Sequence, residues 1–372
     1  MKLTRRLVAA AAVGTLLLAG CGSGSGGGGG DAGSEFSGKI TFAIASAVTA
    51  PKEEVAIVAV GTKMGYFAEE GLTVDAINAD GSVAAVQAVA SGSADITPAD
   101  AGSILAAVQN NVPVKAIGGL VQNWPWQIAT LPDSPIRTGA DLKGKRLGVI
   151  SLASGSAPYA RAFIRDAGLQ PDTDVQLVPV GVGAQATAAL TSGEVDALAL
   201  YGQAYTVIEL SGTQLRYLDN PPIFDGIRSL TFAVPQRALE QNREAYVRFL
   251  RAAYKSMLFS AANPRAAMQM GYEVFPQILA GADPASRIEA DTKTLAKWLE
   301  SATPREGQPS DWTFWGDISE EEWAKTQAYT KEAGQISSEI PLDRVWDPSL
   351  LEAANNFDAQ QVLKQAAEYR QP

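Results

Sequence analysis

Short apolar runs alternate with amphipathic stretches through the first two thirds of this 372-residue chain. The strand-like runs are residues 39–45, 73–77, 94–97 and 114–120, and the helical stretches between them are residues 52–66, 83–90 and 101–109. Strands joined by helices pair in parallel, because each helix returns the chain to the edge where the next strand begins. The pattern therefore predicts an α/β fold with mostly parallel sheets flanked by helices.

The same order of signals recurs in the middle of the chain. The pair GK at 38–39 returns at 144–145, the pair GL at 71–72 returns at 168–169, and SGSADI at 91–96 returns as SGEVDA at 192–197. The repeated pairs precede strand-like runs at 146–150 and 175–180. Three matches in one order indicate two lobes built on the same plan. One large doubly wound sheet is the alternative.

Two proline-containing stretches, at 132–135 and 221–234, indicate where the chain passes between the lobes. We expect lobe 1 to comprise residues 37–131 and 234–372, and lobe 2 to comprise residues 132–233. Residues 231–234 should return to lobe 1 as a strand, followed by helices at 237–262, 264–279, 285–299, 319–334 and 358–369. Ser319, with Glu322 three positions later, has the spacing of an N-terminal capping box.

The first twenty residues, 1–20, have the pattern of a secretory signal peptide. Lys2, Arg5 and Arg6 precede an apolar run at 7–18, which is too short to span a bilayer core as a helix. The run ends in LAGC, which resembles the bacterial lipobox, where the chain is cleaved before a cysteine that is then acylated. Cys21 is the single cysteine of the sequence and the predicted lipidation site, carrying palmitate. An ordinary signal peptide with a chance cysteine is the alternative.

Residues 21–36 are rich in glycine and serine, which predicts a flexible tether between the lipid and the folded body. No later segment is apolar enough to span a membrane. We therefore expect a soluble, extracytoplasmic body that is anchored to the outer face of the cell membrane through Cys21.

Charge and histidine content exclude several functions. The chain has 30 basic and 40 acidic residues, and removal of residues 1–20 takes away three bases, which changes the formal charge from −10 to −13. Nucleic acid is an improbable partner for such a chain, because nucleic-acid binding needs a basic surface. The sequence contains no histidine, which removes histidine-based catalytic triads and histidine-ligated zinc. We expect no enzyme activity, no metal and no cofactor.

Four motifs occur in order along residues 39–235. They are GYF at 65–67 with EGL at 70–72, ASG at 90–92 with DI at 95–96, DLKGKR at 141–146, and SGEVDA at 192–197. Through them the chain resembles the periplasmic-binding-protein-type solute receptors of the sulfonate/taurine/nitrate and thiamine-pyrimidine-precursor family. The helical C-terminal part agrees with this family only in general character.

The resemblance implies a two-lobed periplasmic-binding-protein type II fold, with a ligand cleft between the lobes and a helical C-terminal extension. It further implies the solute-binding component of an ABC importer, with a membrane permease as its partner. We expect a monomer. Fungal pyrimidine synthases of this fold consume a histidine of their own active site, which this chain lacks.

The cleft should lie where the strand ends of both lobes meet helix N-termini. The candidate ligand-binding residues of lobe 1 are Ser46, Ala47, Val48, Thr49, Gly81, Ser82 and Asp100, and those of lobe 2 are Ser154, Gly155, Ser156, Tyr201, Gln203 and Tyr205. The hydroxyls of Ser82 and Ser156, with free helix amides, suit an oxygen-rich group such as a carboxylate or sulfonate. The alternative for each serine is a helix cap alone.

Aromatic residues complete the predicted site. Asn123, Trp124 and Trp126 follow a strand of lobe 1, and aromatic faces there and at Tyr201 and Tyr205 can enclose a planar ligand. At least one of Trp124 and Trp126 is expected to be structural.

Trp315 lies in a loop between predicted helices and is a candidate lid residue. Arg161 and Arg165 are expected to face solvent, so no arginine is assigned to the cleft. The ligand expected is a small, planar or acidic organic molecule: an aromatic carboxylate, a sulfonate or a pyrimidine-like compound.

Capture and release of an unchanged ligand by lobe closure is the leading hypothesis for the function. A lipid-anchored sensor that presents a ligand to another protein is an alternative. A carboxylate-based enzyme is a further alternative, with Asp100 as its first candidate catalytic residue because it is the one acidic residue expected at a strand end.

Overall fold

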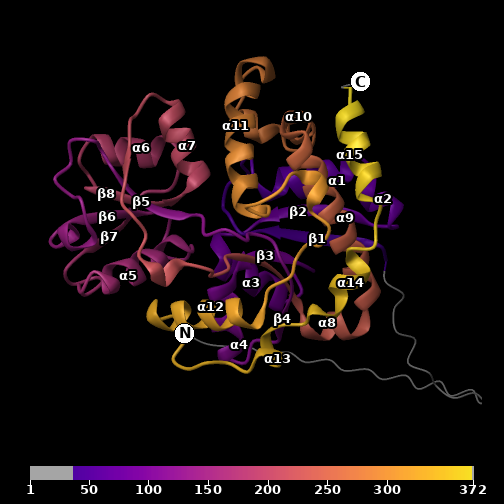
Figure 1. Ribbon diagram of the computed structural model, residues 1–372, viewed down its shortest axis with the longest axis horizontal. Helices are drawn as coiled ribbons and strands as arrows, with labels where there is room; N and C mark the ends of the chain where they lie inside the picture. The colour runs from indigo at the N-terminus through magenta and orange to yellow at the C-terminus, as the bar shows by residue number, and fades with distance from the viewer. Residues whose placement is uncertain (1–36, 371–372) are drawn as a thin grey trace, which may run out of the picture. The chain divides into compact units, whose positions relative to one another are not determined.

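Three sheets are present in the computed structural model, which describes residues 37–370 (Figure 1). The predicted signal peptide at 1–20, the predicted lipidation site Cys21 and the whole of the predicted tether at 21–36 lie outside the described residues. Within 37–370, no helix combines the length and apolarity that crossing a membrane requires.

Lobe 1 contains two of the sheets. Strands β1 (Lys39–Ile44) and β2 (Thr73–Asn78) pair in parallel, as the alternation of elements predicted. The second sheet has the order β3-β10-β4, formed by β3 (Thr97–Asp100), β10 (Leu230–Pro235) and β4 (Val114–Gly119). Its pairs are antiparallel, because β10 re-enters lobe 1 from the other lobe. Helices α3 (Gly81–Ala90) and α4 (Ala101–Gln109) pack against this lobe's strands.

Lobe 2 is built on a five-stranded sheet of order β7-β6-β8-β5-β9. Its strands are β5 (Trp126–Thr130), β6 (Arg146–Val149), β7 (Gln176–Pro179), β8 (Ala197–Tyr201) and β9 (Arg216–Tyr217). Strands β7, β6 and β8 are parallel, whereas β5 is antiparallel to β8 and β9. Helices α5 (Ser156–Asp166), α6 (Ala184–Thr191) and α7 (Gly202–Leu210) lie around it in Figure 1.

The place where the chain first crosses between the lobes differs from the expectation. Residues 126–130 were expected in lobe 1, with the crossing near 132, but they form β5 inside the lobe 2 sheet. Trp126 pairs with Tyr201 at the first position of this strand. The apolar run WQIAT thus finds its backbone partners in β8, and the chain changes lobes before it rather than after it.

The first predicted helix, at 52–66, is divided into different helical types. Glu54–Ala59 form a π-helix (η1), followed by α1 (Val60–Lys63) and α2 (Tyr66–Glu69). Gly65 separates α1 from α2 with a φ of 79°, a left-handed conformation that glycine adopts without steric cost. All six residues of η1 are buried in the lobe 1 core, so this segment has no solvent-facing side.

The C-terminal part is helical, as predicted. Its longer helices are α9 (Arg243–Ala262), α10 (Pro264–Val274), α11 (Pro284–Ala302), α12 (Glu320–Glu332) and α15 (Ala359–Glu368). The shorter ones are α8 (Gln236–Gln241), α13 (Leu342–Val345) and α14 (Leu351–Ala354). The predicted capping box of α12 is confirmed: Ser319 Oγ accepts from the Glu322 amide and Glu322 Oε2 accepts from the Ser319 amide.

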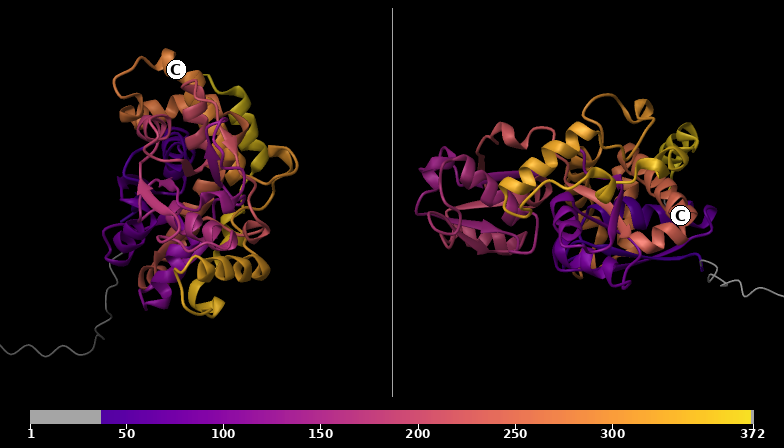
Figure 2. Two further views of the ribbon diagram at one scale, coloured as in Figure 1. Left: turned by 90° about the vertical axis from the view of Figure 1, so that its left-hand side faces the viewer. Right: turned by 90° about the horizontal axis from the view of Figure 1, so that it is seen from below.

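Two of these helices contact both lobes. Helix α12 packs on α4 of lobe 1 and on α5 of lobe 2, and in Figure 2 (right) it passes between them. Tyr329 of α12 is buried in the lobe 2 core. Helix α11 belongs to the lobe 1 core through Trp298 and also packs on α7 of lobe 2. The C-terminal extension therefore covers the junction between the lobes.

Candidate functional site

A cavity of about 420 Å³ lies between the two lobes, at the strand ends where the sequence predicted a cleft. Its volume is within the range of small-molecule sites. Lobe 1 contributes the loop after β1, the start of α3 and the end of β3, whereas lobe 2 contributes the start of β5 and the loops after β6, β7 and β8. Helix α11 adds Trp298 and Ser301.

Most of the predicted site residues line this cavity. They are Ser46, Ala47, Val48, Gly81, Ser82, Asp100, Trp126, Ser154, Gly155, Tyr201 and Gln203. The predicted residues that do not line it are Thr49, Asn123, Trp124, Ser156, Tyr205 and Trp315.

Two of the predicted polar residues that do not line the cavity, Ser156 and Asn123, hold the framework around it. Ser156 is fully buried, and its hydroxyl accepts from the Ile150 amide at 2.9 Å, so it ties the start of α5 to the end of β6. Asn123 donates from Nδ2 to the carbonyls of Glu300 and Thr303, at 2.7 and 2.9 Å, which fixes the end of α11. Both side chains are therefore saturated by the protein itself.

Thr49 and Tyr205 bind other parts of the protein instead. The Thr49 hydroxyl donates to Asn78 Oδ1 at 3.3 Å and accepts from Gln277 Nε2 at 3.3 Å. The hydroxyl of Tyr205 lies inside lobe 2, where it accepts from the Leu200 amide at 3.0 Å and donates to the Leu198 carbonyl at 2.7 Å. The first turn of α7 directs Tyr205 back under β8. The sequence distance between Tyr205 and the end of β8 could not reveal this direction.

Of the predicted tryptophans, only Trp126 lines the cavity. Trp124 stacks on Phe224 in the lobe 2 core, with ring centroids 5.3 Å apart. Trp315, expected as a lid, is instead 3% exposed and stacks on Tyr254 in the lobe 1 core. A loop position therefore did not make Trp315 a surface residue.

Aromatic faces from both lobes border the cavity. Trp126 and Tyr201 are in edge contact, with ring centroids 5.4 Å apart at an angle of 62°. Trp298 of α11 lies in the same lining and is 2% exposed. Rigid aromatic surfaces of this kind suit a planar ligand, because they provide contact area at little cost in side-chain entropy.

Sequence reasoning missed a buried ionic cluster formed by Lys52, Glu53 and Glu54. The Lys52 ammonium lies 2.5 Å from Glu53 Oε1 and 2.9 Å from Glu54 Oε2, and all three residues are at most 5% exposed. Lys52 and Glu53 line the cavity. Three consecutive charged residues directly before the apolar run VAIVAV were a visible signal, since buried charges occur in pairs or networks.

Burial and mutual contact shift the pKa values of this cluster. Burial alone would lower the pKa of Lys52, but Glu53 and Glu54 outweigh it and hold that pKa above its usual range. Burial raises the pKa of Glu54, and Lys52 opposes that rise. Tyr201 of lobe 2 responds to the same charges: burial raises its pKa to about 12, with Lys52 acting in the opposite direction. The cluster thus faces lobe 2 across the cavity.

Asp100 lies at the junction of the two lobes and is 3% exposed. A methyl group placed on Gly155 would lie 3.0 Å from Trp126 Cζ2 and 3.6 Å from Asp100 Oδ1, so lobe 2 packs closely here. Burial raises the pKa of Asp100 to about 7, although the amides of Gly102 and Ser103 act to lower it. No group of three acidic, cysteine or histidine side chains within residues 37–370 is arranged to hold a metal ion.

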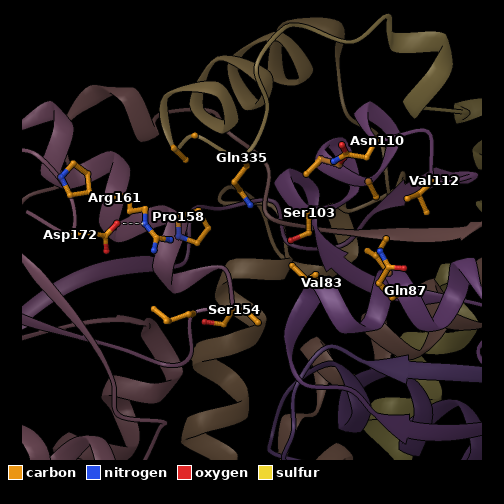
Figure 3. A pocket seen from close by; sticks show the side chains of 18 of the residues that line it. Val83, Gln87, Ser103, Asn110, Val112, Ser154, Pro158, Arg161, Asp172 and Gln335 are labelled. Atoms are coloured by element: carbon orange, nitrogen blue, oxygen red, sulfur yellow. Dashed lines mark hydrogen bonds and ion pairs between the residues drawn. The ribbon is translucent and has the colours of Figure 1, made fainter.

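A second cavity, of about 570 Å³, opens on the other side of Ser154, which lines both (Figure 3). Arg161 and Arg165 line it on α5, so the expectation that they face solvent is corrected: both are half-buried. Arg161 pairs with Asp172 at 3.1 Å. Lobe 1 faces these residues with Ser103 and the exposed apolar side chain of Val83.

Comparisons with known proteins give two curated relatives at low identity. The chain is 24% identical over 291 residues to the riboflavin-binding protein RibY of Chloroflexus aurantiacus, covering 77% of this chain and 79% of that protein. It is 24% identical over 216 residues to the formylaminopyrimidine-binding protein of Halalkalibacterium halodurans, covering 57% of this chain and 64% of that protein. Both relatives are named as binding proteins.

Solved structures share the fold. The periplasmic aliphatic sulphonate binding protein SsuA from Escherichia coli matches with a TM-score of 0.62 and 17% identity, over 84% of this chain and 92% of that one. The desulfurization enzyme DSZB matches with a TM-score of 0.55 and 16% identity, over 86% of this chain and 99% of that one. The expected periplasmic-binding-protein fold is thereby confirmed.

The family of the chain is shown by a direct match between its sequence and a family model. The model of the family described as NMT1/THI5 like matches residues 52–267, which is more than half of the sequence and includes strands of both lobes. The resemblance inferred from the sequence motifs is therefore confirmed, and the chain belongs to the NMT1/THI5-like family.

Proposed function

We propose that this chain is the lipid-anchored, extracytoplasmic solute-binding component of an ABC importer. In this role it is a monomer that binds a small organic molecule between its lobes and delivers it to a membrane permease. The observation that carries the proposal is the interlobe cavity, which both lobes line at their strand ends. The two curated relatives, both named as binding proteins, support the same function.

Ligand binding by lobe closure is the mechanism we propose. A molecule that touches both lobes stabilises the closed arrangement over the open one by its differential affinity for the two. Gly81 of lobe 1 already approaches lobe 2 closely: a methyl group placed on it would lie 2.9 Å from the Ala153 carbonyl oxygen. Closure at this point removes bound ligand from water, and opening at the permease releases it.

The lining supports a planar organic ligand. Trp126, Tyr201 and Trp298 provide flat apolar surfaces, and the start of α3 provides backbone amides that lack helical partners. A pyrimidine-like or other heteroaromatic compound fits both features. No bond in the ligand needs to be made or broken for this function.

A thermal-shift screen of the mature chain tests the proposal. We expect a heteroaromatic compound to raise the unfolding temperature, because a ligand at 100 times its Kd adds about 2.7 kcal/mol to the free energy of unfolding. Mass spectrometry of the recovered compound should show it unchanged. Chemical conversion of the bound compound would contradict a pure binding function.

A carboxylate-based enzyme is a second candidate, because burial raises the pKa of Asp100 to about 7, near the value that suits a general base. The desulfurization enzyme DSZB also shares the fold. Asp100→Asn separates the two functions. Under the enzyme hypothesis the variant loses turnover, whereas under the binding hypothesis it changes affinity and there is no turnover to lose.

A further inference from the structure

A turn after α12 returns the chain from lobe 2 to lobe 1. Tyr329 and Ala333 belong to the lobe 2 core, whereas Ile336, three positions after Ala333, belongs to the lobe 1 core. Gly334 lies between them with a φ of 78°, a left-handed conformation that suits glycine. Residues 333–340, which we call the return segment, therefore span the junction of the lobes.

Hydrogen bonds fix the return segment to both lobes. On the lobe 2 side, Arg165 of α5 donates from Nη1 to the Glu332 carbonyl at 2.5 Å, directly before the segment. On the lobe 1 side, the Ser337 amide donates to Gln109 Oε1 of α4 at 2.9 Å. Gln335 lies between these two attachments.

The side chain of Gln335 meets Asp100 inside the junction. Gln335 lines the second cavity (Figure 3), and Asp100 lines the interlobe cavity. A methyl group placed on Gly102 would lie 2.5 Å from Gln335 Oε1 and 3.0 Å from Asp100 Oδ2, so the two oxygens flank the same point. The pair is therefore part of the wall between the two cavities.

Neither of these oxygens has a hydrogen-bond donor. Asp100 Oδ2 and Gln335 Oε1 are both buried and without a partner among the described residues. An ionised Asp100 would leave two desolvated acceptors facing the same point, which is unfavourable. A protonated carboxyl group has an O–H donor, so a single proton on Asp100 Oδ2 gives both oxygens a partner.

The charges around Asp100 agree with a protonated carboxyl group. Burial raises its pKa to about 7, two backbone amides of α4 act to lower it, and no charged side chain contributes. Tyr329 of α12 is close by, and burial holds the pKa of its phenol well above the usual value, so this group is neutral. The charged residues that share the cavity lining with Asp100 are Lys52, Glu53 and Asp80.

Basic side chains of the adjoining elements have partners of their own. Arg228, which precedes β10, pairs with Glu322 of α12 at 2.6 Å. Arg161 of α5 pairs with Asp172, and Arg165 donates to the carbonyl next to the return segment. None of these cations is therefore available to stabilise an ionised Asp100.

We propose that Asp100 and Gln335 form a proton-dependent clasp between lobe 1 and the return segment, in which Asp100 Oδ2 carries a proton and donates a hydrogen bond to Gln335 Oε1. Ionisation of the carboxyl group removes this hydrogen bond, so the return segment is then held less tightly. Because the pKa is raised in the folded chain, the clasp is present at acidic pH and is lost as pH rises through about 7. This inference goes beyond the proposed binding function and does not depend on it.

Carbon-13 NMR of the aspartate carboxyl groups tests the protonation. In the labelled chain, the resonance that is missing from Asp100→Asn belongs to Asp100. It should titrate near pH 7 in the wild type, and at lower pH in Gln335→Met, which keeps the length of the side chain but removes the acceptor. An Asp100 that is already ionised at pH 5 would show that Gln335 donates its amide group to a carboxylate, and would overturn the inference.

Hydrogen exchange of the return segment tests the clasp itself. The Ser337 and Ile340 amides donate to Gln109 and Gln327, at 2.9 and 2.7 Å, so both are reporters of local opening. Protection factors remove the intrinsic effect of pH on exchange. They should fall about three- to tenfold between pH 5 and pH 8 in the wild type, the effect of one hydrogen bond. Equal protection at the two pH values would contradict the clasp.

Three variants separate the clasp from a general effect of pH. Asp100→Asn places an N–H donor where the proton lies, so protection should stay high at both pH values. Gln335→Met should give low protection at both. Gln360→Met makes the same change at an exposed residue of α15 and should follow the wild type. If Asp100→Asn were as poorly protected as Gln335→Met, no hydrogen bond would join the two side chains and the inference would be wrong.

Discussion

Asp100 carries a carboxyl group in a place where burial penalises its charge. It is 3% exposed, and its Oδ2 has no hydrogen-bond partner among the described residues. Tyr329 of α12 is the nearby titratable group, and burial holds its pKa well above the ordinary tyrosine value. With no base to stabilise the charged form, burial raises the pKa of Asp100 from 3.8 to about 7.

The pH dependence of stability should reveal this carboxyl group. Between about pH 4 and 7 the folded chain binds the Asp100 proton while the unfolded chain has released it. The contribution of Asp100 to the free energy of unfolding therefore falls as pH rises through that window, by up to about 4 kcal/mol. Asp100→Asn should remove this decrease in the free energy of unfolding. Urea unfolding at several pH values measures that free energy for the wild type and the variant.

An exposed aspartate provides the comparison for this experiment. Asp343→Asn removes a carboxyl group at a solvent-exposed position outside the cavity. The pH profile of this variant should follow that of the wild type. A profile of Asp100→Asn that also follows the wild type would show that the charge of Asp100 is compensated in the folded chain.

Side-chain directions mark the limit of what the sequence predicts at this scale. Asp100 and Tyr201 were found because a residue at a strand end faces the cleft whatever its neighbours are. Tyr205 and Trp315 were misplaced because the turn of a helix or loop decides which way such a ring points. Glu53 was missed because its burial depends on the packing of η1 inside the core, which no local pattern shows.

Helix α3 begins at the contact between the lobes. Gly81 has a φ of 82°, and a methyl group placed on it would lie 2.9 Å from the Ala153 carbonyl oxygen of lobe 2. Gly92, just after the same helix, has a φ of 76° and nothing within 4 Å of such a methyl group. The two glycines share a left-handed conformation, which costs glycine nothing but strains an L-residue, and they differ in the interlobe contact.

Replacing each of the two glycines with alanine separates the effect of backbone strain from the effect of lobe closure. Both variants should lose about 1 kcal/mol of folding stability, because an L-residue in the left-handed region carries that order of strain. Only Gly81→Ala should also weaken ligand binding, by about tenfold or more, since its methyl group pushes against Ala153 when the lobes close. Calorimetry with the ligand from the screen measures the difference. Equal affinities in the two variants would show that Gly81 does not take part in closure.

At the level of elements, the sequence predicted most strands and helices but not all of their partners. The alternation of apolar runs and amphipathic stretches gave β1, β2, β6 and β7 in place and in parallel pairs. The alternation did not predict β5. A five-residue run after Pro125 has no local signal of a strand, and it becomes one only because it pairs antiparallel with β8. Pairing between residues far apart in the sequence, such as Trp126 with Tyr201, depends on the folding of the whole lobe.

At the level of the whole molecule, the proposed binding site and the predicted lipid attachment lie in separate parts of the chain. Every residue that lines the cavity lies between Ala45 and Ser301. The predicted lipid attachment, Cys21, precedes the described residues. Loss of the lipid should therefore change where the protein is found without changing what it binds.

The variant Cys21→Ser tests this separation in a bacterial host that processes lipoproteins. Serine cannot form the thioether through which a lipid is attached, so radiolabelled palmitate should enter the wild type and the neighbouring control Ser23→Ala, but not the variant. Fractionation should then move Cys21→Ser from the membrane to the extracytoplasmic fluid, while its ligand affinity stays equal to that of the wild type. Because an anchored receptor is held at high local concentration near its permease, the released variant should support slower uptake at equal expression. Palmitate in the variant, or its retention at the membrane, would show that another feature of the chain provides the attachment.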